Sequence, residues 1–241
     1  MKILIIRHAD PDYSIDSLTE QGKIEAELLS QMLCKKDIKA FYVSPLGRAR
    51  HTADYTLAKL SREATVCDWL KEFPAVIDRP DRKNSIAWDW RPKDWTDYDE
   101  FFSASDWLSH PVMQNSDVAK EYAHITSELD KLLFAHGYVR DGRKYKVESP
   151  NEDTIALFCH FGLECVLLSH LVNISPMQLW HGFCAAPSSV TTLITEEREK
   201  GIAYFRINAF GETAHLYAGG EEPSFAARFC ETYDNKAQRH D

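Results

Sequence analysis

The sequence predicts an α/β protein with a mostly parallel central sheet, helices on both faces and one antiparallel edge strand. Two short and continuously apolar runs, residues 3–6 and 155–159, are typical of parallel strands buried on both faces. Segments with helical spacing of apolar residues lie between and after these runs. Near the C-terminal end, Gly201 separates two further strand-like segments, residues 190–195 and 202–207, and this pair is expected to be antiparallel.

The N-terminal part of the chain alternates strands and helices. Ser44 and Pro45 together predict a helix start, because serine is a favoured N-cap and proline is favoured at the first helical position. The elements predicted here are a strand over residues 2–7, a helix from about residues 18–19, a strand over 40–43, a helix over 45–60 and a strand over 63–69.

Residues 73–116 interrupt this alternation. The segment is rich in tryptophan, proline and charge, and it is interpreted as the start of a lid or cap inserted at about residues 73–150 of a single domain spanning 1–241. Its tryptophans are expected mostly to pack a small core of their own, with some able to contact a substrate. After it, the pattern predicts a helix over 117–136, a hairpin over 138–145, a strand over 154–159 and helices over 163–171 and 176–182.

Composition and charge limit the possible functions. The chain is 44% hydrophobic and 27% charged, and its formal net charge is −9, which argues against a nucleic-acid partner. No apolar run approaches the roughly 18 residues of a membrane span, so neither a membrane partner nor a signal peptide is expected. Six cysteines without metal-ligand spacing suggest reduced thiols, a cytoplasmic protein, and no metal or other cofactor.

Four polar residues are expected to meet at one edge of the sheet. Arg7 and His8 follow the first strand, His160 follows the strand over 154–159, and Arg48 lies in the first turn of a helix that follows another strand. The C-terminal ends of parallel strands form the usual ligand crevice of such sheets. Each residue alone has an ordinary structural explanation, but together they suit a phosphoryl group, since imidazole can be a nucleophile and guanidinium binds phosphate oxygens.

In four blocks the chain resembles the histidine phosphatase superfamily, also called the phosphoglycerate-mutase-like family. The resemblance implies that family's fold, and it covers about residues 2–60 and 154–195. The blocks, in family order, are Leu4-Ile5-Ile6-Arg7-His8-Ala9, Leu18-Thr19-Glu20-Gln21-Gly22, Ser44-Pro45-Leu46-Gly47-Arg48-Ala49-Arg50-His51-Thr52-Ala53 and Phe158-Cys159-His160-Phe161-Gly162.

The resemblance also implies a role for each matching residue. His8 would be the nucleophile that becomes phosphohistidine, and Arg7, Arg48 and a protonated His160 would bind the phosphate. Glu72, in a Leu-x-Glu context, would be the proton donor, and Ser14 would be a further phosphate contact. The chain departs from the common pattern at Ala9 and Phe161, where many members have glycine, but neither departure removes a nucleophile or a charge.

These residues point to a metal-independent hydrolase of small phosphate esters. A phosphoglycerate-mutase-type transfer is the alternative, and the short loop from residue 9 to 17 disfavours it. A non-catalytic phosphate-binding module is the third possibility. A cysteine phosphatase is set aside because no cysteine has an arginine six positions later, and Asp10-Pro11-Asp12 does not directly end its strand as a magnesium-dependent phosphatase would require. The particular phosphate ester and the oligomeric state stay open.

Overall fold

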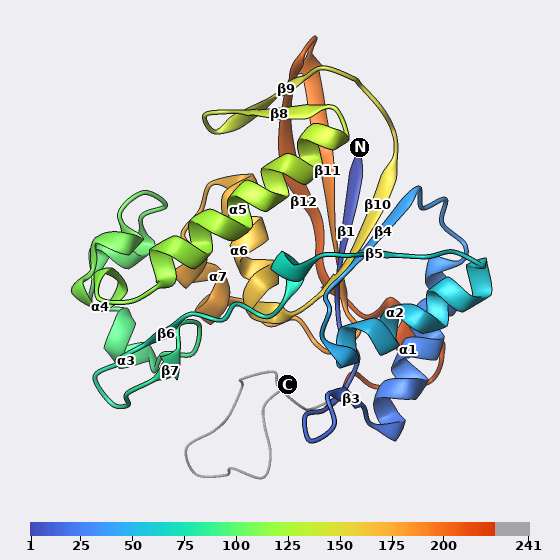
Figure 1. Cartoon of the computed structure of the whole chain (residues 1–241), viewed down its shortest axis with the longest axis horizontal. Helices are drawn as coiled ribbons and strands as arrows, with labels where there is room; N and C mark the ends of the chain where they lie inside the picture. Colours follow the sequence, from blue (N-terminus) through green and yellow to red (C-terminus); the bar gives the residue numbers. More distant parts are fainter. Residues whose placement is uncertain (225–241) are drawn as a thin grey trace.

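The computed structural model describes residues 1–224, and in these residues an eight-stranded sheet is flanked by helices (Figure 1). Two additional pairs, β2–β3 and β6–β7, form small separate sheets. The strands are β1 (Lys2–Arg7), β2 (Pro11–Asp12), β3 (Ser17–Leu18), β4 (Ala40–Val43), β5 (Thr65–Val66), β6 (Val76–Ile77), β7 (Ser85–Ile86), β8 (Tyr138–Asp141), β9 (Lys144–Val147), β10 (Thr154–Cys159), β11 (Val190–Glu199) and β12 (Ile202–Glu212).

The helices of the described residues surround this sheet. The α-helices are α1 (Glu20–Leu33), α2 (Gly47–Leu60), α3 (Pro92–Trp95), α4 (Pro111–Gln114), α5 (Val118–Ala135), α6 (Phe161–Val172), α7 (Pro176–Gly182) and α8 (Ala214–Ala218). Three short 3₁₀-helices are η1 (Asp68–Leu70), η2 (Asp99–Phe102) and η3 (Trp107–Ser109). No helix within residues 1–224 combines the length and the apolar character needed to cross a membrane.

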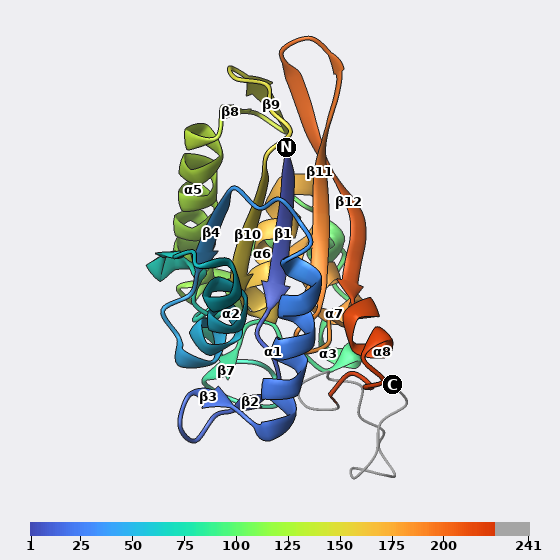
Figure 2. The same cartoon turned by 90° about the vertical axis from the view of Figure 1, so that its right-hand side faces the viewer.

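The large sheet has a parallel half and an antiparallel half, in the order β5-β4-β10-β1-β11-β12-β9-β8. Strands β5, β4, β10 and β1 are parallel, whereas β1–β11 and every later neighbouring pair are antiparallel. The predicted fold class is therefore confirmed, and the antiparallel part contains four strands where one edge strand was expected. In the parallel half, Arg7 pairs with Cys159, so β1 and β10 end at the same level (Figure 2).

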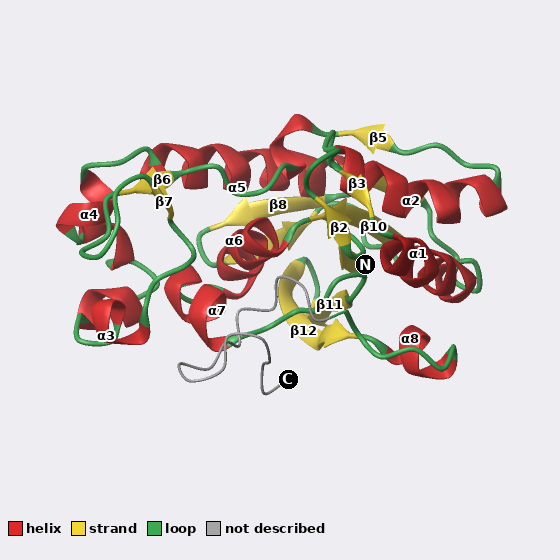
Figure 3. Cartoon of the chain, turned by 90° about the horizontal axis from the view of Figure 1, so that it is seen from below, coloured by secondary structure: helices red, strands yellow, loops and turns green. Residues whose placement is uncertain are grey.

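The alternating side chains of β1 build two cores on opposite faces of the sheet. Ile3 and Ile5 pack in a cluster with residues of α5, α6 and α7, whereas Leu4 and Ile6 pack with residues of α1 and α2. All four side chains are buried, as expected for a strand covered on both faces. Figure 3 shows α1 and α2 grouped together, away from α6 and α7. This sandwich leaves the ends of the strands as the place where polar side chains can gather.

Two predicted element boundaries were wrong. Helix α2 begins at Gly47, with Leu46 and not Ser44 at the N-cap position. The Ser44 hydroxyl instead contacts His160, a bond between distant segments that local sequence preferences do not reveal. The strand expected over 63–69 is reduced to β5, because residues after Cys67 turn into the 3₁₀-helix η1.

Residues 73–150 have two parts. In the first, Trp90, Trp95 and Trp107 are buried among other core residues, in agreement with a mainly packing role for the aromatic rings. In the second, α5 packs against α6, and the hairpin β8–β9 joins the edge of the large sheet through β12. The division into a single domain over 1–241 with an inserted lid stays a prediction.

Candidate active site

Two histidines meet where β1 and β10 end. The backbone N–H of His8 donates to the carbonyl oxygen of Cys159 at 3.0 Å, which joins the two strand ends directly. The rings of His8 and His160 lie 5.1 Å apart between centroids. Both residues are buried, with 2% and 0% of their surface exposed. The parallel pairing of β1 and β10 thus delivers both imidazoles to one place.

The tautomer of His8 follows from its neighbour. Its Nδ1 lies 2.8 Å from the carbonyl oxygen of Ala9. A carbonyl oxygen accepts hydrogen bonds and never donates them, so Nδ1 carries the hydrogen. In the neutral ring, the lone pair is therefore on Nε2. That nitrogen is the one available for attack on an electrophile.

Ser44, which follows β4, fixes His160. Nε2 of His160 and the Ser44 hydroxyl lie 2.9 Å apart, and both residues are fully buried. Nδ1 of His160 is buried and has no hydrogen-bond partner in the described residues. A third strand end therefore contributes to the same cluster. Ser44 was expected only as a helix cap, although its position directly after a strand could have indicated a site residue.

Arg7 is buried beside the histidines, with 3% of its surface exposed. Its Nη1 donates to the carbonyl oxygen of Ala185, in the segment between α7 and β11. The guanidinium carbon lies 5.6 Å from the centre of the Phe161 ring. The last residue of β1 is thus held on both sides, and its charge is kept close to the two imidazoles.

Arg48 lies in the first turn of α2 and is held by the loop that precedes β3. Its Nη1 is 2.6 Å from Oδ1 of Asp16, while Oδ2 of the same carboxylate accepts from the backbone N–H of Gly47 at 2.6 Å. Although burial acts to raise it, the hydrogen bonds from Gly47 and Arg48 lower the pKa of Asp16. The Tyr13 ring lies 5.4 Å from the Arg48 guanidinium carbon. Asp16 was not predicted as a site residue, because it lies in a loop without any sequence pattern.

Glu72 lies at the N-terminus of α6. Its Oε1 accepts from the backbone N–H groups of Phe73 at 2.8 Å and Leu163 at 2.9 Å. Burial raises the pKa of Glu72, although these backbone N–H groups and the charge of Arg7 act in the opposite direction. A carboxyl group with a raised pKa is suited to give and take a proton near neutral pH.

The two histidines are neutral in the free site. Burial lowers the pKa of His8 well below its ordinary value, and the charges of Arg7 and Arg48 add to this effect. Burial, His8 and the same two arginines lower the pKa of His160 in the same direction. Both arginines therefore lie close enough to act on both rings. The protonated His160 that the family resemblance implies concerns the site with phosphate bound, and it stays a prediction.

Ser14 is placed differently from the other predicted residues. It is exposed, and its hydroxyl donates to Oδ1 of Asp12 at 2.6 Å. Its contacts are with its own loop and do not connect it to the histidine cluster. The structure thus brings together Arg7, His8, Arg48, His160 and Glu72, while the phosphate contact assigned to Ser14 stays a prediction.

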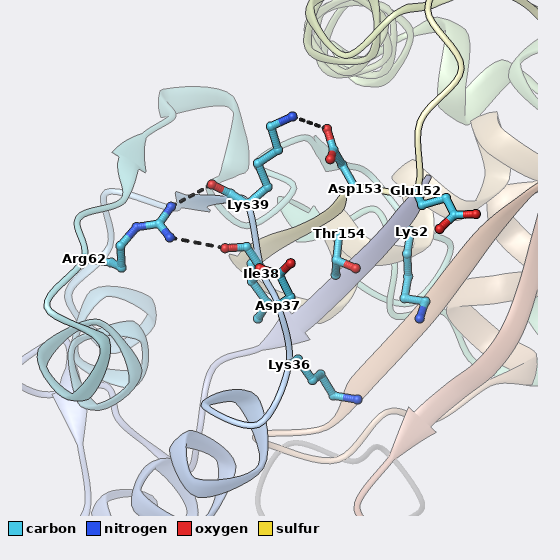
Figure 4. A pocket seen from close by; sticks show the side chains of 9 residues that line it. All are labelled: Lys2, Lys36, Asp37, Ile38, Lys39, Arg62, Glu152, Asp153 and Thr154. Atoms are coloured by element: carbon cyan, nitrogen blue, oxygen red, sulfur yellow. Dashed lines mark hydrogen bonds and ion pairs between the residues drawn. The ribbon is translucent and has the colours of Figure 1, made fainter.

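A separate pocket of about 700 Å³ opens at the opposite end of the parallel strands, near the starts of β1 and β10 (Figure 4). Two of its four basic lining residues already have protein partners. Lys39 pairs with Asp153, and the Arg62 guanidinium donates to the carbonyl oxygens of Ile38 and Lys39. The carboxylates of Asp37, Glu152 and Asp153 also line it and oppose the binding of an anion, so the strand-end cluster is the better candidate. Within residues 1–224, no three His, Cys, Asp or Glu side chains gather to hold a metal ion.

Comparison with known proteins adds a match to a family model. The model of a family described as the histidine phosphatase superfamily (branch 1) matches residues 3–208. That span contains the five clustered side chains and all eight strands of the large sheet except the first residue of β1 and the end of β12. A search of the curated proteins gave no match.

Solved structures share the fold at low sequence identity. A mutant phosphoserine phosphatase from Entamoeba histolytica, in complex with phosphoserine, superposes with a TM-score of 0.60 at 19% identity, covering 89% of this chain and 98% of that one. A mycobacterial glucosyl-3-phosphoglycerate phosphatase gives 0.56 at 16% identity, with 87% and 98% covered. An α-ribazole phosphatase from Shigella flexneri gives 0.55 at 17% identity, with 88% and 97% covered.

Proposed function

Because the chain belongs to the histidine phosphatase superfamily (branch 1), we propose that it hydrolyses small phosphate monoesters through a phosphohistidine on His8. The observation that carries the proposal is the 2.8 Å contact between Nδ1 of His8 and the Ala9 carbonyl oxygen. It leaves Nε2 with a lone pair inside a cluster of cationic side chains. A phosphoryl group that binds to that cluster therefore lies next to the nucleophilic nitrogen.

The first half of the reaction forms a P–N bond. Nε2 of His8 attacks phosphorus in line with the ester oxygen, and the bond between phosphorus and that oxygen breaks. Arg7 and Arg48 neutralise the phosphoryl oxygens, and catalysis depends mainly on this positioning and charge stabilisation. The carboxylic acid of Glu72 gives its proton to the departing oxygen, so that the product leaves as an alcohol.

The second half restores the free site. The Glu72 carboxylate takes a proton from a water molecule, whose oxygen attacks phosphorus. The P–N bond breaks, its electron pair returns to Nε2 of His8, and inorganic phosphate leaves. A dianion in the site raises the pKa of His8 and His160, since opposite charge favours the protonated ring. We therefore propose that His160 becomes protonated when the phosphoryl group binds, with its Nε2 held by Ser44.

The short segment between β1 and α1 favours hydrolysis over a phosphoglycerate-mutase-type transfer. Helix α1 begins at Glu20, so the connecting loop with β2 and β3 is compact. In a mutase, a second substrate hydroxyl would take the phosphoryl group in place of water.

The remaining segment, residues 73–150, is proposed to act as a lid over this site.

The experiment is to mix the protein with ³²P-labelled phenyl phosphate in the presence of a chelator and to quench the reaction in base. We expect a burst of labelled protein that is stable in base and labile in acid, together with release of inorganic phosphate. His8→Ala should lose the label and at least about 10⁴-fold of the rate. His124→Ala, an exposed histidine on α5, is the matched control.

Three outcomes would contradict this proposal. Label that persists in His8→Ala would place the nucleophile elsewhere. Transfer to an added diol or phosphoglycerate in preference to water would indicate a mutase. Binding of phosphate without labelling by any ester would indicate a non-catalytic module.

A further inference from the structure

A hollow of about 350 Å³ with mainly aromatic walls adjoins the candidate active site. The walls come from the segment that contains α3 and from the end of α7. They include Trp88, Trp90, Trp95, Trp180 and Phe183. A volume of this size is at the lower end of the range of small-molecule sites and can hold an aromatic ring. Trp88 and Phe183 keep part of their surface exposed, so the hollow opens to solvent.

The hollow lies next to Glu72, the proposed proton donor. A Cβ built on Gly162 would come 2.7 Å from Oε1 of Glu72 and 2.8 Å from Cε2 of Trp88. The carboxyl group and the wall of the hollow therefore flank the same glycine. The Trp88 ring also makes an edge contact with Phe161, whose own ring lies under the Arg7 guanidinium.

A second connection runs along the backbone. Cys184 lines the hollow, and the next residue, Ala185, accepts the hydrogen bond from Arg7. The hollow thus meets the phosphate cluster at Arg7 and the proton donor at Trp88. A group bonded to the departing ester oxygen, which Glu72 protonates, would extend into this space.

The charges of the hollow disfavour a second anionic group. None of its described lining residues is lysine or arginine, and the Asp89 carboxylate, which pairs with Arg79 at 3.6 Å, is its acidic group. Burial lowers the pKa of His181 to about 4, so this ring is neutral. His181 Nε2 accepts from the backbone N–H of Trp90 at 3.0 Å, and Nδ1 lies 2.7 Å from the Met177 carbonyl oxygen. Its polar atoms are already used by the protein.

We infer that this hollow binds the organic part of the substrate, and that the substrate is a phosphate monoester of an uncharged alcohol with an aromatic or bulky apolar group. The inference rests on the proposed function. Indole and phenyl rings bind such a group by stacking and by removal of apolar surface from water. A carboxylate on the alcohol would lie near the Asp89 carboxylate, and the neighbouring cation, Arg79, already pairs with Asp89 and Asp81.

The test uses three esters whose alcohols have similar acidity, so that the chemical step is matched. They are 2-phenylethyl phosphate, ethyl phosphate and 3-(phosphonooxy)propanoate. We expect kcat/KM to be at least about ten-fold higher for the phenylethyl ester than for the ethyl ester, since apolar pockets discriminate by such factors. The carboxylate-bearing ester should be the poorest of the three.

Variants separate the hollow from the phosphate cluster. Phe183→Ala removes a half-exposed ring and should lower the ratio of kcat/KM for the phenylethyl ester to that for the ethyl ester. Asp89→Lys should raise kcat/KM for the carboxylate-bearing ester several-fold. Phe134→Ala, which removes an exposed ring on α5, is the control and should leave the ratio unchanged.

The outcomes distinguish this inference from the function on which it rests. Equal rates on the three esters, or a preference for the carboxylate-bearing one, would overturn the role of the hollow while the phosphatase activity stands. An unchanged ratio in Phe183→Ala, with the folded state intact by circular dichroism, would overturn it as well. Hydrolysis of none of the esters, with no labelled histidine, would overturn both proposals.

Discussion

At the scale of single residues, the hydrogen-bond partners of the two histidines decide which ring nitrogen each presents to the site. The Ala9 carbonyl oxygen fixes the hydrogen of His8 on Nδ1, and Ser44 occupies Nε2 of His160. The two rings therefore present different nitrogens to the site although they belong to the same residue type. One is proposed as the nucleophile and the other as a binding group, and the difference comes from neighbours one hydrogen bond away.

Glu72 can be tested by the acidity of the leaving group. In Glu72→Gln the departing oxygen of an alkyl ester receives no proton, so we expect kcat for ethyl phosphate to fall by about 10²–10⁴-fold. The loss for 4-nitrophenyl phosphate should be much smaller in the first step, because nitrophenolate leaves without protonation. Burst-phase kinetics with both esters measures that step.

Glu164 provides a matched control for this assignment. It is a buried carboxyl group on α6, and burial raises its pKa to about 7, while Thr191 and the charge of Arg7 act in the opposite direction. Glu164→Gln should leave the dependence on leaving-group acidity as in the unchanged protein. A selective loss on ethyl phosphate in Glu164→Gln and not in Glu72→Gln would move the role of proton donor to Glu164.

Ser44→Ala tests the residue that positions His160. The substitution leaves a buried imidazole nitrogen without its partner, a loss of about 1–3 kcal/mol in general. We expect kcat/KM to fall by about ten-fold or more, with weaker inhibition by inorganic phosphate. Ser189→Ala is the control, since that buried hydroxyl has no hydrogen-bond partner in the described residues. Equal losses in both variants would show a general packing effect.

At the scale of elements, the site is built where α6 starts. The backbone N–H of Leu163 binds Glu72, and His160 stands at the N-cap position of the same helix. An N-terminal helix end with unpaired N–H groups favours a carboxylate and a phosphoryl group alike. Gly162 belongs to this helix start, and the atoms nearest to a Cβ built on it belong to Glu72 and Trp88.

Gly162→Ala is therefore expected to act through Glu72. The added methyl group would come within 2.7 Å of Oε1, so the carboxyl group must move or the helix start must shift. The predicted result is the same selective loss on alkyl esters as in Glu72→Gln, measured by the same burst-phase comparison. Equal losses on alkyl and nitrophenyl esters would instead indicate a distorted phosphate cluster.

The sequence predicted the parts of the site that follow long, buried strands. His8 and His160 were placed correctly because β1 and β10 are continuous apolar runs, whose ends share one edge of the sheet. Ser44 and Asp16 were missed because their contacts join residues 116 and 32 positions apart. The two-residue strand β5 was overestimated, since its pairing with β4 and not its own pattern defines it.

The antiparallel half of the sheet was underestimated for a related reason. The pair β11–β12 was expected from its own pattern, but β11 lies beside β1 in the middle of the sheet. The hairpin β8–β9 was also expected, and its attachment through β12 depends on the Ile202–Lys146 register. Pairing between distant segments is a tertiary property, and a local pattern does not encode which partner a strand takes.

At the scale of the whole molecule, the net charge of −9 opposes the binding of an anion at the proposed site. The local cations are Arg7 and Arg48, and Asp16 already neutralises part of the Arg48 charge. Because the two histidines are neutral in the free site, they add no positive charge that would repel the two arginines. If a bound anion restores the positive charge of His160, binding is linked to proton uptake.

This linkage predicts that the protein binds a dianion more tightly as the pH falls. Sulfate is a suitable probe because it stays a dianion between pH 8 and pH 5.5, unlike phosphate. Bound sulfate raises the pKa of His8 and His160 from their lowered values, so the complex holds more protons than the free protein. Its Kd should fall by up to about ten-fold per pH unit for each proton taken up.

The measurement is the rise in Tm with sulfate at pH 5.5 and pH 8, with sodium chloride at equal ionic strength as the reference for screening and general salt effects. His160→Gln should reduce the difference between the two pH values, and Arg48→Ala should reduce the rise itself at both. An equal rise at both pH values would show that the histidines do not take up protons with the anion. The positive charge for binding would then come from the arginines alone, and the proposed protonation of His160 would be wrong.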